Sequence, residues 1–205
     1  MDYVLAAGRR QRKRQAIHQR ILDVSDQLFR ERGVAGTTVD DIAEAADVAR
    51  QTFFNHFPYK EACAVELAAD GIESVAQKAH CLLEFGLPAL DVLCRTAEAV
   101  LEAALQDGER AAVVARELLH PDPERAQRAA QQVPLYEVIE AILVQAREEG
   151  SVRSDLPLDV VASRICGVVR GMSAQILSSD PAQLRLELAV SFDMVINGIA
   201  ERRIS

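Results

Sequence analysis

The sequence has few of the residues that interrupt helices. Its 205 residues include only 10 glycines and 7 prolines, and β-branched residues nowhere alternate over a long run. A sheet protein depends on such runs and on turn residues, so their scarcity argues against one. Because 49% of the residues are hydrophobic, enough material for a core is present. The sequence therefore predicts an all-α fold, with room for one large or two small domains.

Cysteine and histidine are also scarce, with four of each. No two cysteines have Cys-x-x-Cys spacing, and no histidine lies at metal-ligand spacing from one of them, which argues against a zinc site. We expect Cys63, Cys81, Cys94 and Cys166 to be reduced, mostly buried thiols. A redox sensor, which needs an exposed thiolate, is the alternative. We expect no metal and no cofactor.

Catalytic and membrane-spanning motifs are missing as well. The chain has no Gly-x-Ser-x-Gly, no P-loop and no Gly-x-Gly-x-x-Gly sequence, and its histidines are scattered. We therefore expect a protein that is not an enzyme. No run approaches the length of a membrane span, and the apolar residues 4–7 precede a basic run, which reverses the order of a secretory signal. We expect a cytoplasmic protein with no membrane partner.

The net charge of −8 is divided unevenly along the chain. Residues 1–60 contain ten Lys or Arg against eight Asp or Glu, a balance of +2. Residues 61–205 contain thirteen against twenty-three, a balance of −10. An acidic body with a basic tip, concentrated in residues 9–14, would direct nucleic acid to the tip. A solvated basic tail is the alternative interpretation.

The stretch over residues 37–60 has the pattern of two short helices joined by a tight turn. Thr38 is a typical N-cap, and Asp41 three residues later completes a capping-box-like pair. Residues 46–48 break the helical period, as a turn would. A second helix is predicted over about residues 49–56, and Pro58 ends it because proline cannot continue the helical hydrogen-bond ladder.

The second short helix has an apolar face and a polar face. Since each residue turns a helix by about 100°, Gln51 and Asn55 point almost opposite Phe53, which we expect to be buried. Glutamine and asparagine can pair with an adenine edge and arginine with guanine, so the polar face suits a reader of the DNA major groove. A solvated face on a small helical hairpin is the alternative. The residues on or beside this face are Arg50, Gln51, Thr52, Phe54 and Asn55.

Residues 17–67 resemble the DNA-binding head of the TetR (tetracycline-repressor-like) family. The match is dense and correctly spaced, although it covers only about a quarter of the chain. It implies a three-helix helix-turn-helix domain over residues 1–58 and a helical ligand-binding and dimerisation domain over residues 59–205, with about nine helices in all. The residues that carry the resemblance are Arg20, Ile21, Leu22, Leu28, Phe29, Gly33, Thr37, Thr38, Val39, Asp41, Ile42, Ala43, Val48, Thr52, Phe53, Asn55, His56, Phe57, Pro58, Lys60 and Glu61.

Five positions depart from the pattern of that family. Asp47 stands where the turn usually has glycine, although aspartate tolerates a left-handed turn better than most residues. Ala49 replaces a serine or threonine, so the second helix loses its side-chain cap. Gln51 replaces a glycine, Phe54 a tyrosine whose hydroxyl could touch phosphate, and Tyr59 a small polar residue. These changes bear on single contacts rather than on the fold of the head.

The resemblance implies a dimeric transcriptional repressor that a small-molecule effector releases from a near-palindromic operator in double-stranded DNA. In addition to the polar face of the second helix, Thr38, His56, Lys60 and residues 9–14 are expected at DNA phosphates. The alternative is a non-enzymatic binding module that has the same fold but does not recognise a DNA sequence.

Longer helices are predicted over about residues 13–32, 59–83, 88–106, 157–178 and 181–202. The last two are so apolar that they need partners on more than one side. They could form the centre of a monomer core, but the resemblance implies a homodimer through them. The expected interface residues are Val168, Gly171, Leu188, Phe192 and Val195.

The resemblance also implies a ligand pocket among the central helices. The acidic body favours cationic or neutral ligands over anionic ones. The candidate lining residues are Phe85, Leu118, Tyr136, Ile139 and Met172.

Overall fold

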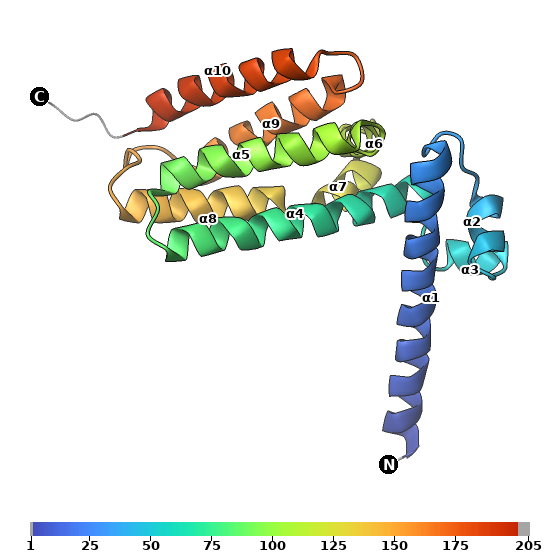
Figure 1. Ribbon diagram of the computed structural model, residues 1–205. Helices are drawn as coiled ribbons and strands as arrows, with labels where there is room; N and C mark the ends of the chain where they lie inside the picture. Colours follow the sequence, from blue (N-terminus) through green and yellow to red (C-terminus); the bar gives the residue numbers. More distant parts are fainter. Residues whose placement is uncertain (1, 201–205) are drawn as a thin grey trace, which may run out of the picture. The chain divides into compact units, whose positions relative to one another are not determined.

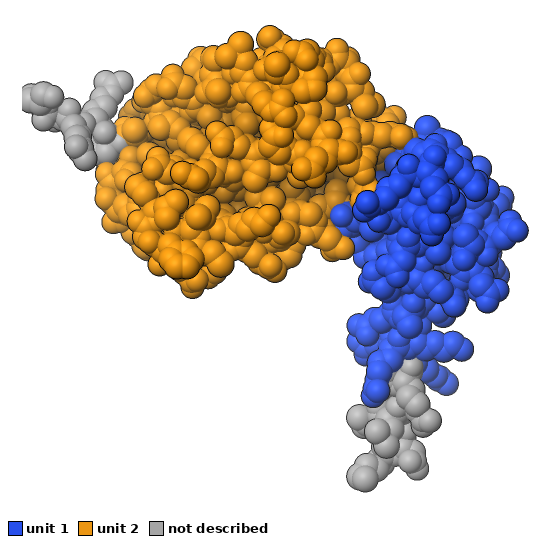
Figure 2. All heavy atoms as spheres, viewed as in Figure 1, with its two compact units in different colours: residues 1–67 blue, residues 68–205 orange. Residues whose placement is uncertain are grey.

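The computed structural model describes the backbone of residues 2–200 and the side chains of residues 10–172 and 175–200. Within these ranges it contains ten α-helices and no strand, which confirms the all-α fold class (Figure 1). The chain divides into two compact units, residues 1–67 (unit 1) and residues 68–205 (unit 2) (Figure 2). The division falls inside α4 (Lys60–Glu84). The functional boundary between residues 58 and 59 stays a prediction.

Unit 1 contains α1 (Asp2–Arg32), α2 (Val39–Ala45), α3 (Arg50–Phe54) and the beginning of α4. The expectation that α1 begins near residue 13 is wrong, because residues 2–12 contain good helix formers and only one glycine to weaken them. The core joins the apolar stripe of α1 to the inner faces of α2 and α3. Its most deeply buried side chains include Ile21, Ile42 and Phe53, each 0% exposed.

Unit 2 contains the rest of α4 and six further helices. These are α5 (Ala89–Gln106), α6 (Gly108–Leu118), α7 (Pro123–Gln132), α8 (Leu135–Glu148), α9 (Leu158–Gln175) and α10 (Pro181–Ile199). Pro134 separates α7 from α8, which accounts for ten helices where about nine were expected.

The helices of unit 2 pack around one apolar core. α8 lies against α5 and α9, α6 lies against α9, and α10 packs on α5 and α9 (Figure 1). Leu143, Ile165 and Leu184 are fully buried between them. The connector after α8 is anchored as well, since the Arg147 guanidinium donates to the carbonyl oxygen of Arg153 at 3.0 Å.

Candidate functional site

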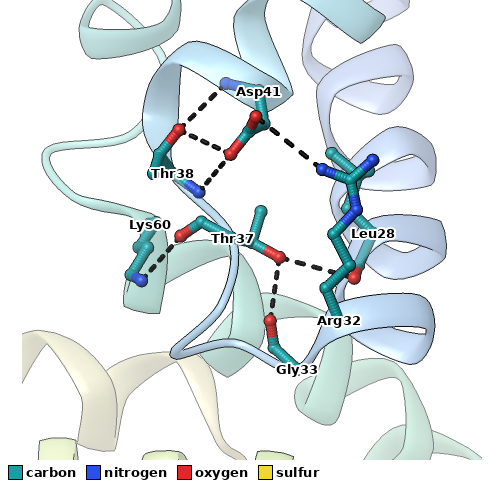
Figure 3. A network of polar contacts seen from close by, with 7 residues as sticks. All are labelled: Leu28, Arg32, Gly33, Thr37, Thr38, Asp41 and Lys60. Atoms are coloured by element: carbon teal, nitrogen blue, oxygen red, sulfur yellow. Dashed lines mark hydrogen bonds and ion pairs between the residues drawn. The ribbon is translucent and has the colours of Figure 1, made fainter.

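The beginning of α2 is fixed by the capping box that the sequence predicts. The amide of Thr38 donates to Asp41 Oδ2 at 2.8 Å, and the amide of Asp41 donates to Thr38 Oγ1 at 3.1 Å (Figure 3). The hydrogen bonds from Thr38, aided by the nearby Arg32 guanidinium, hold the pKa of Asp41 below its ordinary value. The carboxylate therefore stays ionised and keeps the first turn of α2 in place.

The turn between α2 and α3 uses the left-handed conformation expected at Asp47. Its φ is +49°, and among the described residues it is the only one other than glycine with a positive φ. The next amide, from Val48, donates back to the carbonyl oxygen of Ala43 at 2.9 Å. Ala49 follows as an N-cap without a side-chain hydrogen bond, as predicted. This turn sets the direction in which α3 leaves α2.

The two faces of α3 differ as the sequence predicts. Phe53 is 0% exposed and Phe57, just after the helix, is 2% exposed, so the inner face is anchored in the core of unit 1. Gln51 and Asn55 are exposed on the outer face, where Gln51 Nε2 donates to Asn55 Oδ1 at 3.4 Å. Thr52 is half-buried beside them. Two amide side chains thus share one exposed surface above a rigid base.

Arg50 and Phe54 flank the outer face of α3. The Arg50 guanidinium lies 5.6 Å from the centre of the Phe54 ring, and Phe54 is 39% exposed. Arg50 Nη1 also donates to Asp40 Oδ1 of α2 at 2.6 Å. Both members of this ion pair are well exposed, so the pair is worth at most about 1 kcal/mol. Arg50 is consequently held beside the outer face of α3 but can leave at low cost.

Lys60 is engaged inside unit 1. Its ammonium donates to the carbonyl oxygens of Val34 at 2.6 Å, Thr37 at 2.7 Å and Ala35 at 3.4 Å. The contact with Thr37 is visible in Figure 3. The carbonyls belong to the turn between α1 and α2. The predicted phosphate contact of Lys60 therefore competes with internal hydrogen bonds to carbonyl groups 23 to 26 residues earlier in the chain.

A basic hollow of 590 Å³ opens between α1 and the end of α3. Its lining residues are Arg10, Gln11, Arg14, Gln15, His18 and His56. No ion-pair partner is found for Arg10 or Arg14 among the side chains of residues 10–172 and 175–200. Arg9, also part of the predicted basic arm, lies outside those residues.

Two histidines, His18 and His56, lie close together in this hollow, which we call the basic hollow. The ring centres of His18 and His56 are 5.5 Å apart, His18 stacks on Phe57 at 4.5 Å, and His18 Nε2 lies 2.6 Å from Glu66 Oε1. Burial, followed by the nearby charges of His18 and Arg14, lowers the pKa of His56. His18 was not among the predicted site residues, although Arg10, Arg14 and His18 recur every four residues and so share a helix face.

The candidate pocket residues of unit 2 are dispersed. Phe85 follows α4 and is 83% exposed, so the prediction that it lines a pocket is wrong. The reason is its place at the end of α4, where Gly86 takes up the left-handed conformation (φ +78°) that ends the helix. Leu118 and Tyr136 are half-buried, whereas Ile139 and Met172 are buried. Which of them meets a ligand stays a prediction.

Two hollows in the described part of unit 2 are bordered by α5 or α8 and are wide enough to admit small molecules. One, of 490 Å³, lies between α5 and α10 on an apolar floor that includes Leu101 and Phe192. Glu102 and Arg185 pair across it at 2.6 Å. The other, of 300 Å³, lies between α4 and α8 and is lined by residues that include His80 and Val138. Neither includes Phe85, Leu118, Tyr136 or Ile139.

The last two helices have an exposed apolar surface, but its residues are only partly those predicted for the dimer interface. Leu188 and Phe192 are each 4% exposed, because they face the core of their own chain. The exposed apolar side chains of α10 are instead Leu186 (59%), Val190 (50%) and Met194 (70%). Leu186 and Val190 line a shallow groove whose α9 side includes Gly167, Val168, Gly171 and Met172. Val195, also predicted at the interface, is half-buried.

The thiols differ in exposure. Cys63 and Cys166 are buried, Cys94 is half-buried and Cys81 is exposed. Burial raises the pKa of Cys63 to about 12 and raises those of Cys94 and Cys166 as well. Among the described residues, no group of three or more His, Cys, Asp or Glu side chains could hold a metal ion. Within the same residues, no helix has the length and apolar character needed to span a membrane.

Both units match known protein families. Residues 21–67 match the bacterial regulatory proteins of the tetR family, and residues 69–198 match the C-terminal domain of TetR/AcrR family transcriptional repressors. The chain is 31% identical over 149 residues to the HTH-type transcriptional repressor AcnR of Corynebacterium efficiens, covering 70% of this chain and 72% of that protein. It is 25% identical over 154 residues to the repressor DhaR of a Mycobacterium species, covering 73% and 76%.

The fold also matches solved structures. One of them is FadR of Thermus thermophilus, a TetR-family transcriptional repressor crystallised in complex with lauroyl-CoA. It is 30% identical in sequence, with a TM-score of 0.84, and the match covers 91% of this chain and 96% of that chain.

Proposed function

The chain belongs to the TetR family of transcriptional regulators, and from this premise we propose that α3 reads operator DNA with the side chains of its outer face. The protein is a DNA-binding transcriptional repressor that a ligand regulates. The observation that carries the proposal is the exposed pair of Gln51 and Asn55 above the buried Phe53. Such a pair can meet adenine edges in the major groove while the base of α3 stays rigid.

The remaining contacts of unit 1 divide into base reading and phosphate binding. Arg50 reads guanine after leaving Asp40, and Thr52 and Phe54 contact apolar groups or the backbone of the same groove. His56 contacts a phosphate, and the basic hollow receives a further phosphate from the DNA that flanks the site. Thr38 contacts a phosphate only by giving up the hydrogen bond that its hydroxyl donates to Asp41 Oδ2 at 2.6 Å.

A selection experiment tests this function. The full chain would select an operator from a pool of random-sequence duplexes, and its affinity for that operator and for random DNA would then be measured at several salt concentrations. We expect a preference of at least about 10³-fold for the operator. Equal affinities would contradict sequence-specific recognition and favour a binding module that lacks it.

The protein acts as a homodimer through α9 and α10. The exposed side chains of Leu186, Val190 and Met194, together with Gly171 and Val168 of α9, offer a surface that a second copy would cover. A two-fold axis at this surface gives two α3 helices for one site. The operator is then near-palindromic, with half-sites about one DNA turn apart, ~34–36 Å.

The effector is a fatty acyl thioester of coenzyme A. The support is the 30% identity to a repressor crystallised with lauroyl-CoA, over 91% of this chain. This ligand is anionic, whereas the acidic charge of residues 61–205 favoured cationic or neutral ligands, so the two expectations can be separated. Lauroyl-CoA should raise the melting temperature and weaken operator binding by ~5–150-fold, while coenzyme A alone and laurate alone should do neither. A lipophilic amine that acts where lauroyl-CoA does not would contradict the assignment.

Coupling between effector and DNA passes along α4. This helix begins in unit 1 at Lys60 and continues without a break into unit 2. Linkage requires that operator DNA lower the effector's affinity by the same factor by which the effector lowers operator affinity. The protein carries out this switch in the cytoplasm, without catalytic activity of its own.

A further inference from the structure

The Lys60 ammonium has no donor left for a phosphate. A lysine side chain offers three N–H donors and no acceptor. Three carbonyl oxygens, from Val34, Ala35 and Thr37, lie 2.6, 3.4 and 2.7 Å from Nζ. Engaging a DNA phosphate would therefore mean giving up at least one internal hydrogen bond.

The turn over residues 33–37 needs these hydrogen bonds. Within this turn, the amide of Thr37 reaches the carbonyl oxygen of Val34 only at 3.4 Å. Val34 is 3% exposed and Thr37 is 0% exposed, so water does not satisfy their carbonyl groups readily. The Thr37 hydroxyl donates to the carbonyl oxygen of Gly33 at 2.8 Å (Figure 3). Two side chains thus hold the turn, Thr37 from within and Lys60 from α4.

The same turn leads directly into α2. The residue after Thr37 is Thr38, whose hydroxyl and amide form the capping box with Asp41. The carbonyl group of Thr37 therefore connects the ammonium of α4 to the first residue of the helix-turn-helix. A change in the position of the Lys60 ammonium must move this carbonyl group or break its hydrogen bond.

We propose that Lys60 is a positioning residue that clamps the α1–α2 turn, and through it the beginning of α2, to the first turn of α4, rather than a ligand of a DNA phosphate. The proposal deepens the proposed function and rests on it for its effect on DNA. Because α4 continues into unit 2, the clamp is also the point at which a movement of α4 reaches the helix-turn-helix.

A pair of lysine substitutions separates the two roles. Lys60→Met keeps the aliphatic stem and removes the ammonium, while Lys13→Met makes the same change on the exposed surface of α1. With Lys60→Met, we expect the free protein to melt several degrees lower and operator affinity to fall at least about tenfold, without a change in its salt dependence. Lys13→Met should leave the melting temperature unchanged. It should reduce the steepness of log operator affinity against log salt concentration by ~0.9 for each copy of unit 1 that binds the DNA.

The opposite signature would overturn the proposal. If Lys60→Met left the melting temperature unchanged and reduced the salt slope, Lys60 would be a phosphate ligand. The melting temperature is measured without DNA, so it tests the clamp even if the proposed function fails. Such a failure would appear separately, as a wild-type protein without operator preference.

A measurement on the unmodified protein covers the case in which Lys60→Met does not fold. The chain has only three lysines, Lys13, Lys60 and Lys78, so their ammonium groups can be resolved by NMR after ¹⁵N-lysine labelling. We expect one slowly exchanging ammonium signal in the free protein, which Lys60→Arg removes and which operator DNA leaves in place. A Lys60 signal that emerges only when DNA is added would contradict the clamp.

Discussion

The exposed surfaces of α3 and α10 rest on buried phenylalanines but differ in chemistry. On α3, Gln51 and Asn55 lie above Phe53, which is 0% exposed. On α10, Val190 and Met194 are exposed beside Phe192, which is 4% exposed. The first surface is polar and the second apolar.

The difference indicates what each surface can bind. A polar surface over a rigid core loses little free energy when base edges replace water on it, because both offer hydrogen bonds. An apolar surface gains free energy only when another apolar surface covers it. The surface of α3 therefore suits DNA, and the surface of α10 suits a second copy of the chain.

The largest expected effect comes from making the α10 surface charged. Val190→Glu combined with Met194→Glu should give a monomer at micromolar concentration, because two charges on each copy would be buried at the interface. Operator affinity should fall by ~10²–10⁴-fold, since one head then binds without its partner. Sedimentation and titration with selected operator measure the two effects.

Ala189→Glu is the matched control for this pair. It adds a charge to the same helix on the side that faces the hollow between α5 and α10. The control should stay dimeric. A dimer that survives Val190→Glu with Met194→Glu would contradict the proposed interface.

A smaller effect is expected from the polar surface of α3. Gln51→Ala should weaken operator binding by ~1–3 kcal/mol and leave binding to random DNA almost unchanged, because a lost base contact reduces specificity. Gln27→Ala, which removes an exposed glutamine paired with Glu31 on α1, should change neither. An unchanged ratio between operator and random DNA after Gln51→Ala would show that this surface does not read bases.

Features set by local periodicity could be predicted from the sequence. The positions of Gln51 and Asn55 relative to Phe53 follow from the turn of a helix, and the capping box of Thr38 and Asp41 follows from a spacing of three residues. The left-handed Asp47 follows from its place in a tight turn. In each case, interactions within a few residues decide the geometry.

Features set by packing between distant segments could not be predicted. Lys60 meets carbonyl groups 23 to 26 residues earlier, and His18 stacks on Phe57. α10 offers one apolar stripe with Leu188 and another with Leu186, and the sequence alone does not decide which faces the core. The same holds for Phe85, an apolar residue that lies at a helix end and outside the core.

The basic hollow predicts a dependence of DNA binding on pH. The pKa of His56 is lowered in the free protein, so this side chain is mostly neutral near pH 7. A phosphate in the hollow would favour the protonated form and raise the pKa, so binding takes up a proton. Operator affinity should therefore rise as the pH falls from the pKa of His56 in the complex to its pKa in the free protein. The rise should be up to about tenfold for each pH unit between these two pKa values.

His56→Gln tests this dependence, because glutamine cannot titrate. The groups that face His56 are Arg10, Arg14 and His18 of α1, with Glu66 of α4 against His18. The slope that remains in His56→Gln belongs to groups of the complex other than His56. Operator binding by fluorescence anisotropy over about pH 6 to 8 gives both slopes, and equal slopes would exclude His56 as the titrating group.

The smallest effect concerns the Arg50–Asp40 pair, which restrains one side chain of the α3 surface. In the free protein, Asp40 accepts from Arg50 at 2.6 Å, and reading a guanine requires that this contact be broken. Because both side chains are exposed, the contact costs less than about 1 kcal/mol to break. Asp40→Asn should therefore strengthen DNA binding by no more than about fivefold at low salt, and the gain should shrink as salt screens the charges. Glu44→Gln, which removes an exposed charge from the same helix, separates the pair from net charge. If both variants strengthen binding equally, Arg50 is not restrained by Asp40; a larger gain for Asp40→Asn, confined to operator DNA, assigns the difference to Arg50.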